Sequence, residues 1–212
     1  MNYNIQQDSH EYSQGKYMTV QRWSTYAKVI SETMKLNPKN ILEIGPGNNI
    51  VTDVLKKMNY EVKTLDLDNS VHPDYNFSLT DEKINSLKIF DLVIASQVLE
   101  HIRYDDFPLA LKRLSGMAKN AILTLPHTTS NSILFSFSLK LPFLKKIKLT
   151  RKIFFKKIKH NFNGLHYWEI GKDDYPIEKI REDIARSDWK IFDEFLNPEN
   201  PFHYFFILKK HD

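Results

Sequence analysis

The stretch Asn40-Ile41-Leu42-Glu43-Ile44-Gly45-Pro46-Gly47-Asn48-Asn49 decides which fold we expect. Its first half has the length and apolar character of a short buried strand, and helical spacing follows it from about residue 50 to 58. Glycines at a strand-to-helix turn let the backbone approach a ligand closely, and the helix N-terminus offers N–H groups. A dinucleotide site would have a third glycine where Asn48-Asn49 stands, so pyrophosphate binding fits this turn poorly.

Strands and helices alternate along most of the chain. The pattern predicts strands over 60–67, 88–96, 120–125, 189–195 and 204–209, and helices over 17–34, 107–117 and 177–187. Such alternation with short turns predicts an α/β domain with a mostly parallel sheet covered by helices on both faces. Only residues 196–203 join the last two strands, so these should pair antiparallel. We expect one domain over 1–212, with 1–36 as an N-terminal helical cap.

An acidic residue follows the second expected strand. Asp66, in Leu65-Asp66-Leu67-Asp68, comes about 20 residues after the glycine turn. An acid in that place can accept hydrogen bonds from both ribose hydroxyls of an adenosine.

With these features, residues 38–126 resemble the class I S-adenosylmethionine-dependent methyltransferases of the subgroup that acts on small molecules and glycans. Four segments at family-like spacing carry the resemblance: Ile41-Leu42-Glu43-Ile44-Gly45-Pro46-Gly47, Leu65-Asp66-Leu67, Phe90-Asp91-Leu92-Val93-Ile94-Ala95-Ser96-Gln97-Val98-Leu99-Glu100-His101-Ile102 and Ile122-Leu123-Thr124-Leu125-Pro126. The resemblance implies a Rossmann-like seven-stranded sheet with a reversed last strand, and S-adenosyl-L-methionine as cofactor.

The resemblance also implies roles by position. Glu43, Gly45 and Gly47 would line the methionine end of the cofactor, and Ser96 and Gln97 would lie beside the methionine and the sulfonium. Asp66 would bind the ribose with Leu67 next to it, and Leu79 would contact the adenine. The segment around Leu79 lacks the aspartate that is frequent in the family.

Composition and motifs narrow the acceptor. The chain has no cysteine, which excludes disulfides, thiolate metal sites and thiolate nucleophiles. No N-P-P-Y or D-P-P-Y type motif follows the fourth strand, which argues against exocyclic amino groups of adenine. Oxygen, amine and carbon acceptors remain, and we expect metal-independent transfer to an oxygen of a small molecule or glycan.

Two histidines are candidates for the acceptor side. His127 directly follows the fifth strand, at the sheet edge where open α/β folds bind ligands. His166 lies beside Tyr167, Trp168 and Glu169 in a glycine-flanked segment that suits a sugar or another polar ring. That segment resembles a His-x-Trp-Glu pattern of bacterial methyltransferases linked to surface-glycan synthesis. A structural role stays open for both histidines, and His101 is expected to brace a helix start.

The charge is unevenly distributed, although the formal net charge is only +4. No acidic residue lies between Asp106 and Glu169, an interval with twelve lysines and arginines. Lysines alternate there with Ile, Leu and Phe, so we expect residues 128–162 to form a lid of basic amphipathic helices over the acceptor. Contact of residues 139–159 with anionic lipid or a membrane surface is an alternative, and nucleic acid is a less favoured one.

The sequence has no signal-peptide pattern and no apolar run of 18 residues, so we expect a cytoplasmic protein, with peripheral membrane contact as the alternative. Two rival functions stay open. One is an RNA or protein methyltransferase that uses the basic insertion, and the other is a non-catalytic partner subunit with this fold. The oligomeric state is open.

Overall fold

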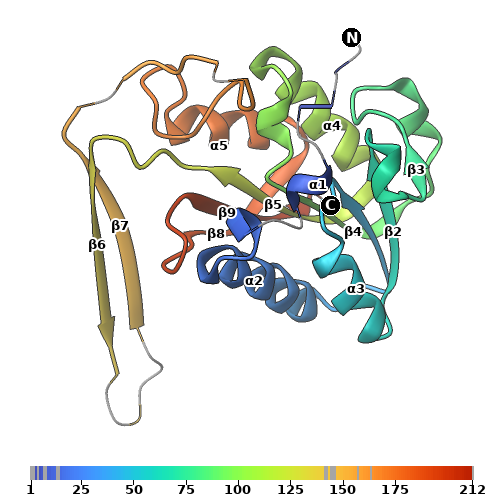
Figure 1. Ribbon diagram of the computed structural model, residues 1–212, viewed down its shortest axis with the longest axis horizontal. Helices are drawn as coiled ribbons and strands as arrows, with labels where there is room; N and C mark the ends of the chain where they lie inside the picture. Colours follow the sequence, from blue (N-terminus) through green and yellow to red (C-terminus); the bar gives the residue numbers. More distant parts are fainter. Residues whose placement is uncertain are drawn as a thin grey trace.

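The fold is built on a seven-stranded sheet (Figure 1). The computed structural model describes residues 3, 5–6, 9–12, 15–140, 143, 147–156, 158–162 and 164–211. The strands follow the order β3-β2-β1-β4-β5-β9-β8. Their bounds are β1 (Asn40–Ile44), β2 (Glu61–Asp66), β3 (Tyr75–Asn76), β4 (Phe90–Ser96), β5 (Ala118–Pro126), β8 (Trp189–Leu196) and β9 (His203–Lys210).

One strand of this sheet is reversed. The pairs β1–β2, β1–β4, β2–β3 and β4–β5 are parallel, whereas β9 is antiparallel to both β5 and β8. The connection from β8 to β9 is too short for a parallel crossover, as the sequence predicted. The expected fold class, a Rossmann-like mostly parallel sheet with a reversed last strand, is confirmed.

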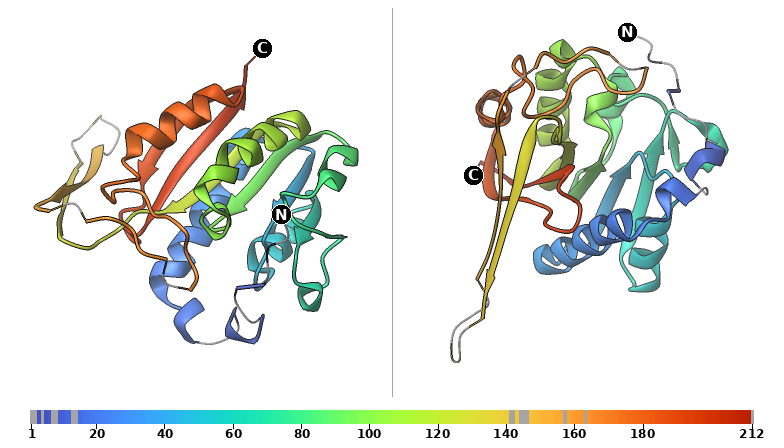
Figure 2. Two further views of the ribbon diagram at one scale, coloured as in Figure 1. Left: turned by 90° about the horizontal axis from the view of Figure 1, so that it is seen from above. Right: turned by 60° about the vertical axis from the view of Figure 1, so that its left-hand side comes forward.

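Helices cover both faces of the sheet (Figure 2). The long helices are α2 (Val20–Leu36), α3 (Ile50–Lys57), α4 (Phe107–Met117) and α5 (Ile177–Arg186). Along β4, Leu92 and Ile94 pack with α2 and α3, while Val93 and Ala95 pack with α4 and α5. Because both faces are buried, the strand is a continuous apolar run rather than an alternating one. The short helices are α1 (Ser9–Tyr12), η1 (Gly15–Tyr17), η2 (Asn69–Val71), η3 (Glu82–Ser86), η4 (Leu99–His101) and η5 (Tyr104–Asp106).

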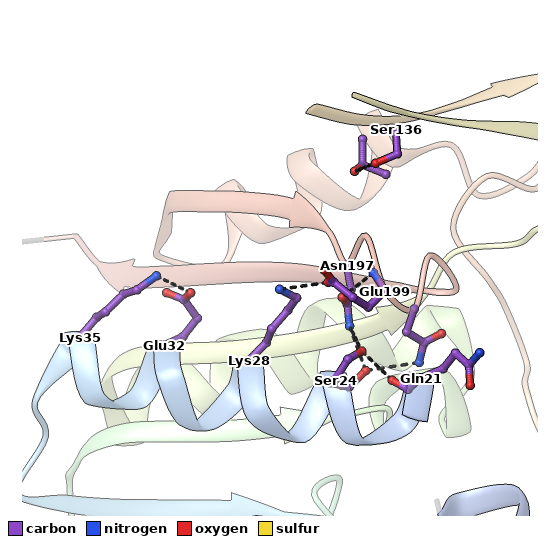
Figure 3. Close-up of polar contacts among 11 residues, drawn as sticks. Gln21, Ser24, Lys28, Glu32, Lys35, Ser136, Asn197 and Glu199 are labelled. Atoms are coloured by element: carbon purple, nitrogen blue, oxygen red, sulfur yellow. Dashed lines mark hydrogen bonds and ion pairs between the residues drawn. The ribbon is translucent and has the colours of Figure 1, made fainter. Parts of the chain in front are cut away.

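The N-terminal segment is fixed to the C-terminal end of the sheet through α2 (Figure 3). The Asn197 amide, in the β8–β9 loop, donates to the Ser24 hydroxyl at 3.1 Å, and the Lys28 ammonium lies 3.3 Å from the Glu199 carboxylate. The helix ends at Leu36, where Asn37 adopts a left-handed conformation before Pro38. The helix predicted over 17–34 is thus observed over 20–36, and its end fixes the direction in which the chain enters β1.

The basic insertion corrects the sequence prediction. Its described residues form an antiparallel hairpin, β6 (Ser132–Leu139) and β7 (Ile147–Phe154), and not amphipathic helices. The reason is the period: Phe135, Phe137 and Leu139 alternate with Ser136 and Ser138, which places apolar side chains on one face of a strand. Part of the predicted helical segment, including 144–146, lies outside the described residues.

The hairpin forms its own two-stranded sheet and projects from the rest of the molecule (Figures 1 and 2). Of the residues described, no helix is long and apolar enough to cross a membrane.

Candidate active site

The turn after β1 brings backbone close to two neighbouring segments. Gly45 and Gly47 have φ angles of +65° and +55°, the left-handed region that favours glycine. A Cβ added to Gly45 would lie 2.5 Å from Cγ2 of Val98, so no larger residue fits without displacement. In place of a third glycine, Asn49 has φ +58°, which asparagine tolerates better than most residues.

A first cavity opens beside this turn at the carboxyl ends of β1, β2 and β4. It is lined by Tyr3, Ile5, Gln6, Tyr12, Ile44, Gly45, Leu65, Asp66, Leu67, Asp68, Phe77, Ser78, Leu79, Gln97, Val98, His101 and Ile102. The Asp66 carboxylate accepts a hydrogen bond from the Asp68 N–H at 2.8 Å, and burial raises its pKa. The cavity thus has mainly apolar walls and two partly buried carboxyl groups, Asp66 and Asp68, at the end of β2.

A second cavity adjoins the first at Tyr12, Gly45, Gln97 and His101. Its lining is more polar and consists of Tyr12, Tyr17, Arg22, Thr25, Tyr26, Glu43, Gly45, Pro46, Gly47, Asn48, Val51, Ser96, Gln97, Glu100, His101, His166 and Phe202. Glu43 accepts a hydrogen bond from the Thr52 hydroxyl, and burial raises its pKa to about 7.

The end of β4 joins the two cavities. Gln97 has φ +60°; its backbone N–H donates to the Thr124 carbonyl at 2.9 Å and its side-chain amide to the Thr124 hydroxyl at 3.2 Å. The Ser96 hydroxyl lies 2.8 Å from the same hydroxyl. All eight residues predicted to contact the cofactor line one cavity or the other: Glu43, Gly45, Gly47, Asp66, Leu67, Leu79, Ser96 and Gln97. Their contact with a cofactor stays a prediction.

His166 lies in the second cavity next to two carboxyl groups. Its Nδ1 is 3.1 Å from Oε1 of Glu169, which is 9% exposed. Burial lowers the pKa of His166, but the hydrogen bond to Glu169 and the charges of Glu100 and Glu169 outweigh it, so the pKa is raised. The same contact holds the pKa of Glu169 below its ordinary value, against the effect of burial. The two residues therefore form a histidine–carboxylate pair.

Glu100 is fully buried beside this pair. In the described part of the chain, neither of its carboxyl oxygens has a hydrogen-bond partner, and burial raises its pKa to about 7. Ligand atoms of Glu100, His101 and His166 lie within 4.8 Å of one another, which is close enough to share a metal ion. His101 Nδ1 is already 2.9 Å from the Gln6 side-chain oxygen and 3.0 Å from the Leu165 carbonyl. The expected absence of a metal stays a prediction.

His127 lies apart from both cavities. Its ring contacts Phe154 of the hairpin and Tyr204 of β9, each at 5.6 Å between ring centroids. Burial and the nearby Lys152 charge lower its pKa to about 3. It lines a different hollow, between β7, α5 and the β8–β9 end of the sheet. The structure thus brings only one of the two candidate histidines, His166, to the predicted cofactor residues.

Residues 18–169 match the family described as methyltransferase domain. The chain belongs to that family. The prediction of an S-adenosylmethionine-dependent methyltransferase is confirmed at the level of family and fold. No curated protein sequence matches the chain.

Solved structures similar to this methyltransferase share its fold at low sequence identity. An S-adenosylmethionine-dependent methyltransferase from Clostridium acetobutylicum is 14% identical, with a TM-score of 0.57 over 96% of this chain and 98% of that one. The glycopeptide N-methyltransferase MtfA with S-adenosyl-L-homocysteine is 13% identical, with a TM-score of 0.58 over 89% of each chain. The Burkholderia thailandensis 1,6-didemethyltoxoflavin-N1-methyltransferase is 13% identical, with a TM-score of 0.54 over 100% of this chain and 94% of that one.

Arg22 and Glu100 line the second cavity, and the sequence predicted no role for either of them. Arg22 and Tyr12 reach the cavity because the N-terminal segment and α2 cross the sheet edge, and no local pattern encodes that crossing. Glu100 could have been found, because it stands next to the apolar Val98-Leu99 pair after β4, and a buried acid is costly unless it has a function.

Proposed function

We propose that this methyltransferase transfers a methyl group from S-adenosylmethionine to an oxygen of a small polar molecule or glycan intermediate, with His166 as the base. The observation that carries the proposal is that His166, bound to Glu169, lines the same cavity as Gly45 and Gln97. The similar structures include enzymes whose names give a glycopeptide or a small heterocycle as the substrate.

The first cavity fits the adenosine part of the cofactor. Asp66 offers a carboxylate to two ribose hydroxyls, and Leu79 and Phe77 offer apolar surface to a ring. A Cβ on Gly45 would collide with Val98, so the backbone there can approach a ligand that a side chain would keep away. Glu43, Ser96 and Gln97 then face the amino-acid part from the second cavity. When bound, the cofactor supplies an electrophilic methyl group on a sulfonium.

The histidine–carboxylate pair suits proton removal from the acceptor. If the Nδ1–H of His166 donates to Glu169, the tautomer leaves Nε2 as the nitrogen that accepts a proton. The acceptor oxygen forms the new bond to the methyl carbon as the carbon–sulfur bond breaks, and its proton passes to Nε2. Removing such a base lowers turnover by about 10²- to 10⁴-fold. Arg22, in the wall of the same cavity, favours an acceptor that carries negative charge.

The test combines labelled S-adenosylmethionine with fractions of small molecules, glycans, RNA and protein. We expect label in a small-molecule or glycan fraction, lost in His166→Gln while the affinity for S-adenosylhomocysteine is unchanged. His211→Gln is a matched control, because His211 is exposed and lines neither cavity. Label in RNA or protein would favour the polymer-modifying alternative. No binding of S-adenosylhomocysteine by the folded protein would favour the partner-subunit alternative.

The pH dependence tests the role of the pair itself. Protonated His166 cannot accept a proton, so turnover should fall as the pH drops through its raised pKa. Glu169→Gln removes an effect that raises this pKa, and should shift the acid limb of the profile to lower pH. An unshifted limb would contradict the role of the pair.

A nitrogen acceptor is the second candidate, because two similar structures are N-methyltransferases by name. A neutral amine has a lone pair and needs no base before attack. Nearly normal turnover in His166→Gln, with the label on nitrogen, would favour this candidate over the oxygen acceptor.

A further inference from the structure

One face of the β6–β7 hairpin is apolar and exposed. Ile133, Phe135, Phe137 and Ile153 are 53%, 52%, 47% and 58% exposed. The register pairs Ile133 with Ile153, so these side chains form one continuous surface across both strands. A lone two-stranded hairpin is marginally stable in water, and an exposed apolar patch marks an interaction site.

The opposite face is mixed: it carries Leu134 and Phe154 beside serines, Thr150 and Lys152, and its base attaches the hairpin to the body. Ser136 and Thr150 pair across the strands, with their hydroxyls 3.2 Å apart (Figure 3 shows Ser136). Lys152 donates to the carbonyls of His127 at 2.6 Å and Thr128 at 2.9 Å. Most of the exposed apolar side chains of the hairpin therefore lie on the face that does not hold it to the body.

The positive charge of the hairpin indicates which kind of partner it binds. From residue 132 to 159 the sequence has nine lysines and arginines and no acid. Exposed Arg151 lies on the apolar face opposite Phe135, exposed Lys140, Lys156 and Lys159 follow the ends of the two strands, and Phe143 at the turn is fully exposed. A second copy of this chain would bring the same positive charge to the contact. A nucleic acid would satisfy the charge but leave the apolar face in water.

We propose that the hairpin docks this methyltransferase on an anionic phospholipid bilayer, with the apolar face at the acyl boundary and the basic residues among the headgroups. Apolar area and attraction to anionic lipid add in such binding. The strands, of eight residues each, span about 27 Å, but their outer backbone groups lack partners within the hairpin. Hydrocarbon does not tolerate such groups, so the hairpin lies along the interface and does not cross it.

Docking leaves the two cavities free. No described residue of the hairpin lines either of them. Variants on the apolar face should therefore change lipid binding without changing the affinity for S-adenosylhomocysteine, which also reports that the protein is folded.

The experiment is co-sedimentation of the full chain with vesicles of phosphatidylcholine, with or without 30% phosphatidylglycerol (about one anionic lipid in three). We expect binding to the anionic vesicles, at least tenfold weaker to neutral ones, and weakened by 0.5 M salt (roughly a 4 Å screening length). The double variant Phe135→Ser/Phe137→Ser should bind at least tenfold more weakly. Phe192→Ser is the matched control, because Phe192 is 60% exposed on β8, outside the hairpin.

Absence of binding to anionic vesicles would overturn the proposal. So would equal binding by Phe135→Ser/Phe137→Ser and the unchanged protein. A dimer in sedimentation that this double variant abolishes, without vesicle binding, would assign the face to a second copy. Tighter binding to an oligonucleotide than to vesicles would assign the basic residues to nucleic acid.

Discussion

Replacing Gly45 by alanine tests how the turn after β1 is built. Two separate costs arise from the structure. A non-glycine residue at φ +65° costs about 1–2 kcal/mol, and a Cβ that lies 2.5 Å from Val98 must displace that side chain, which costs about 1–3 kcal/mol. We expect Gly45→Ala to lower the free energy of unfolding by about 2–5 kcal/mol, measured by urea denaturation.

Substitutions at two other glycines distinguish the backbone cost at positive φ from the steric cost of the added Cβ. The Cβ of Gly47→Ala would lie 3.4 Å from the Tyr12 ring, an ordinary contact, so only the backbone cost of about 1–2 kcal/mol applies. Gly116 lies in α4 with nothing within 4 Å, so Gly116→Ala should stabilise the protein by up to about 1 kcal/mol. The three substitutions thus have predicted effects of different size and sign.

Shortening the Val98 side chain should restore part of the stability that Gly45→Ala loses. In Gly45→Ala/Val98→Ala the added methyl group has room, and the coupling energy between the two sites should be about 1–3 kcal/mol in favour of the pair. Because Val98 lines the first cavity, Gly45→Ala alone should also weaken S-adenosylhomocysteine in calorimetric titration. The reasoning is refuted if Gly45→Ala destabilises no more than Gly47→Ala, or if Val98→Ala gives no recovery.

Three further predictions concern single side chains. Asp66→Ala should weaken S-adenosylhomocysteine at least tenfold in calorimetry, about 1.4 kcal/mol, because the ribose hydroxyls lose their acceptor; an unchanged affinity would contradict the assignment. Burial raises the pKa of Glu100 to about 7, so the folded state binds more protons than the unfolded state and the free energy of unfolding falls as the pH rises from about 4 to 7. The urea midpoints measured at pH 5 and pH 8 should therefore differ less in Glu100→Gln than in the unchanged protein. Arg181, on α5, binds both oxygens of Glu194 on β8, so Arg181→Ala should lower the free energy of unfolding by about 1 kcal/mol, with an equal effect of Glu194→Gln.

The elements that the sequence predicts well are those with local signals. The strand Asn40–Ile44 and its turn follow from an apolar run and two glycines, and the end of α2 follows from Asn37-Pro38. The reversed strand follows from the length of one loop, because the six residues between β8 and β9 cannot make a parallel crossover. Each of these features depends on neighbours in the sequence.

The hairpin was mispredicted because two periods compete in it. Lysines interspersed with Leu and Ile fit a helical face, but Ser136 and Ser138 alternate with Phe135 and Phe137, which fits a strand. The prediction of helices rested on the spacing of the lysines, whereas the aromatic and β-branched residues favour strands. A strict count of alternation over 132–139 would have indicated the hairpin.

The acceptor side could be predicted only in part, because it depends on contacts between distant segments. His127 follows β5 and packs against Phe154 of the hairpin, whereas His166 is bound to Glu169 and lines the second cavity. The choice between the two histidines thus depends on where the hairpin packs. No residue near His127 in sequence carries that information.

The base of the hairpin, around Lys152, and its outer part, around Phe137 and Leu149, have different roles. Its ammonium is partly buried, which lowers its pKa to about 7, yet it donates to two backbone carbonyls after β5. Without Lys152 these carbonyls would lose partners, which buried backbone groups rarely lack. Beyond it, Phe137 and Leu149 pair on the exposed face and contribute nothing to either cavity. The outer part of the hairpin is therefore free to bind a partner, while Lys152 keeps the edge of the sheet intact.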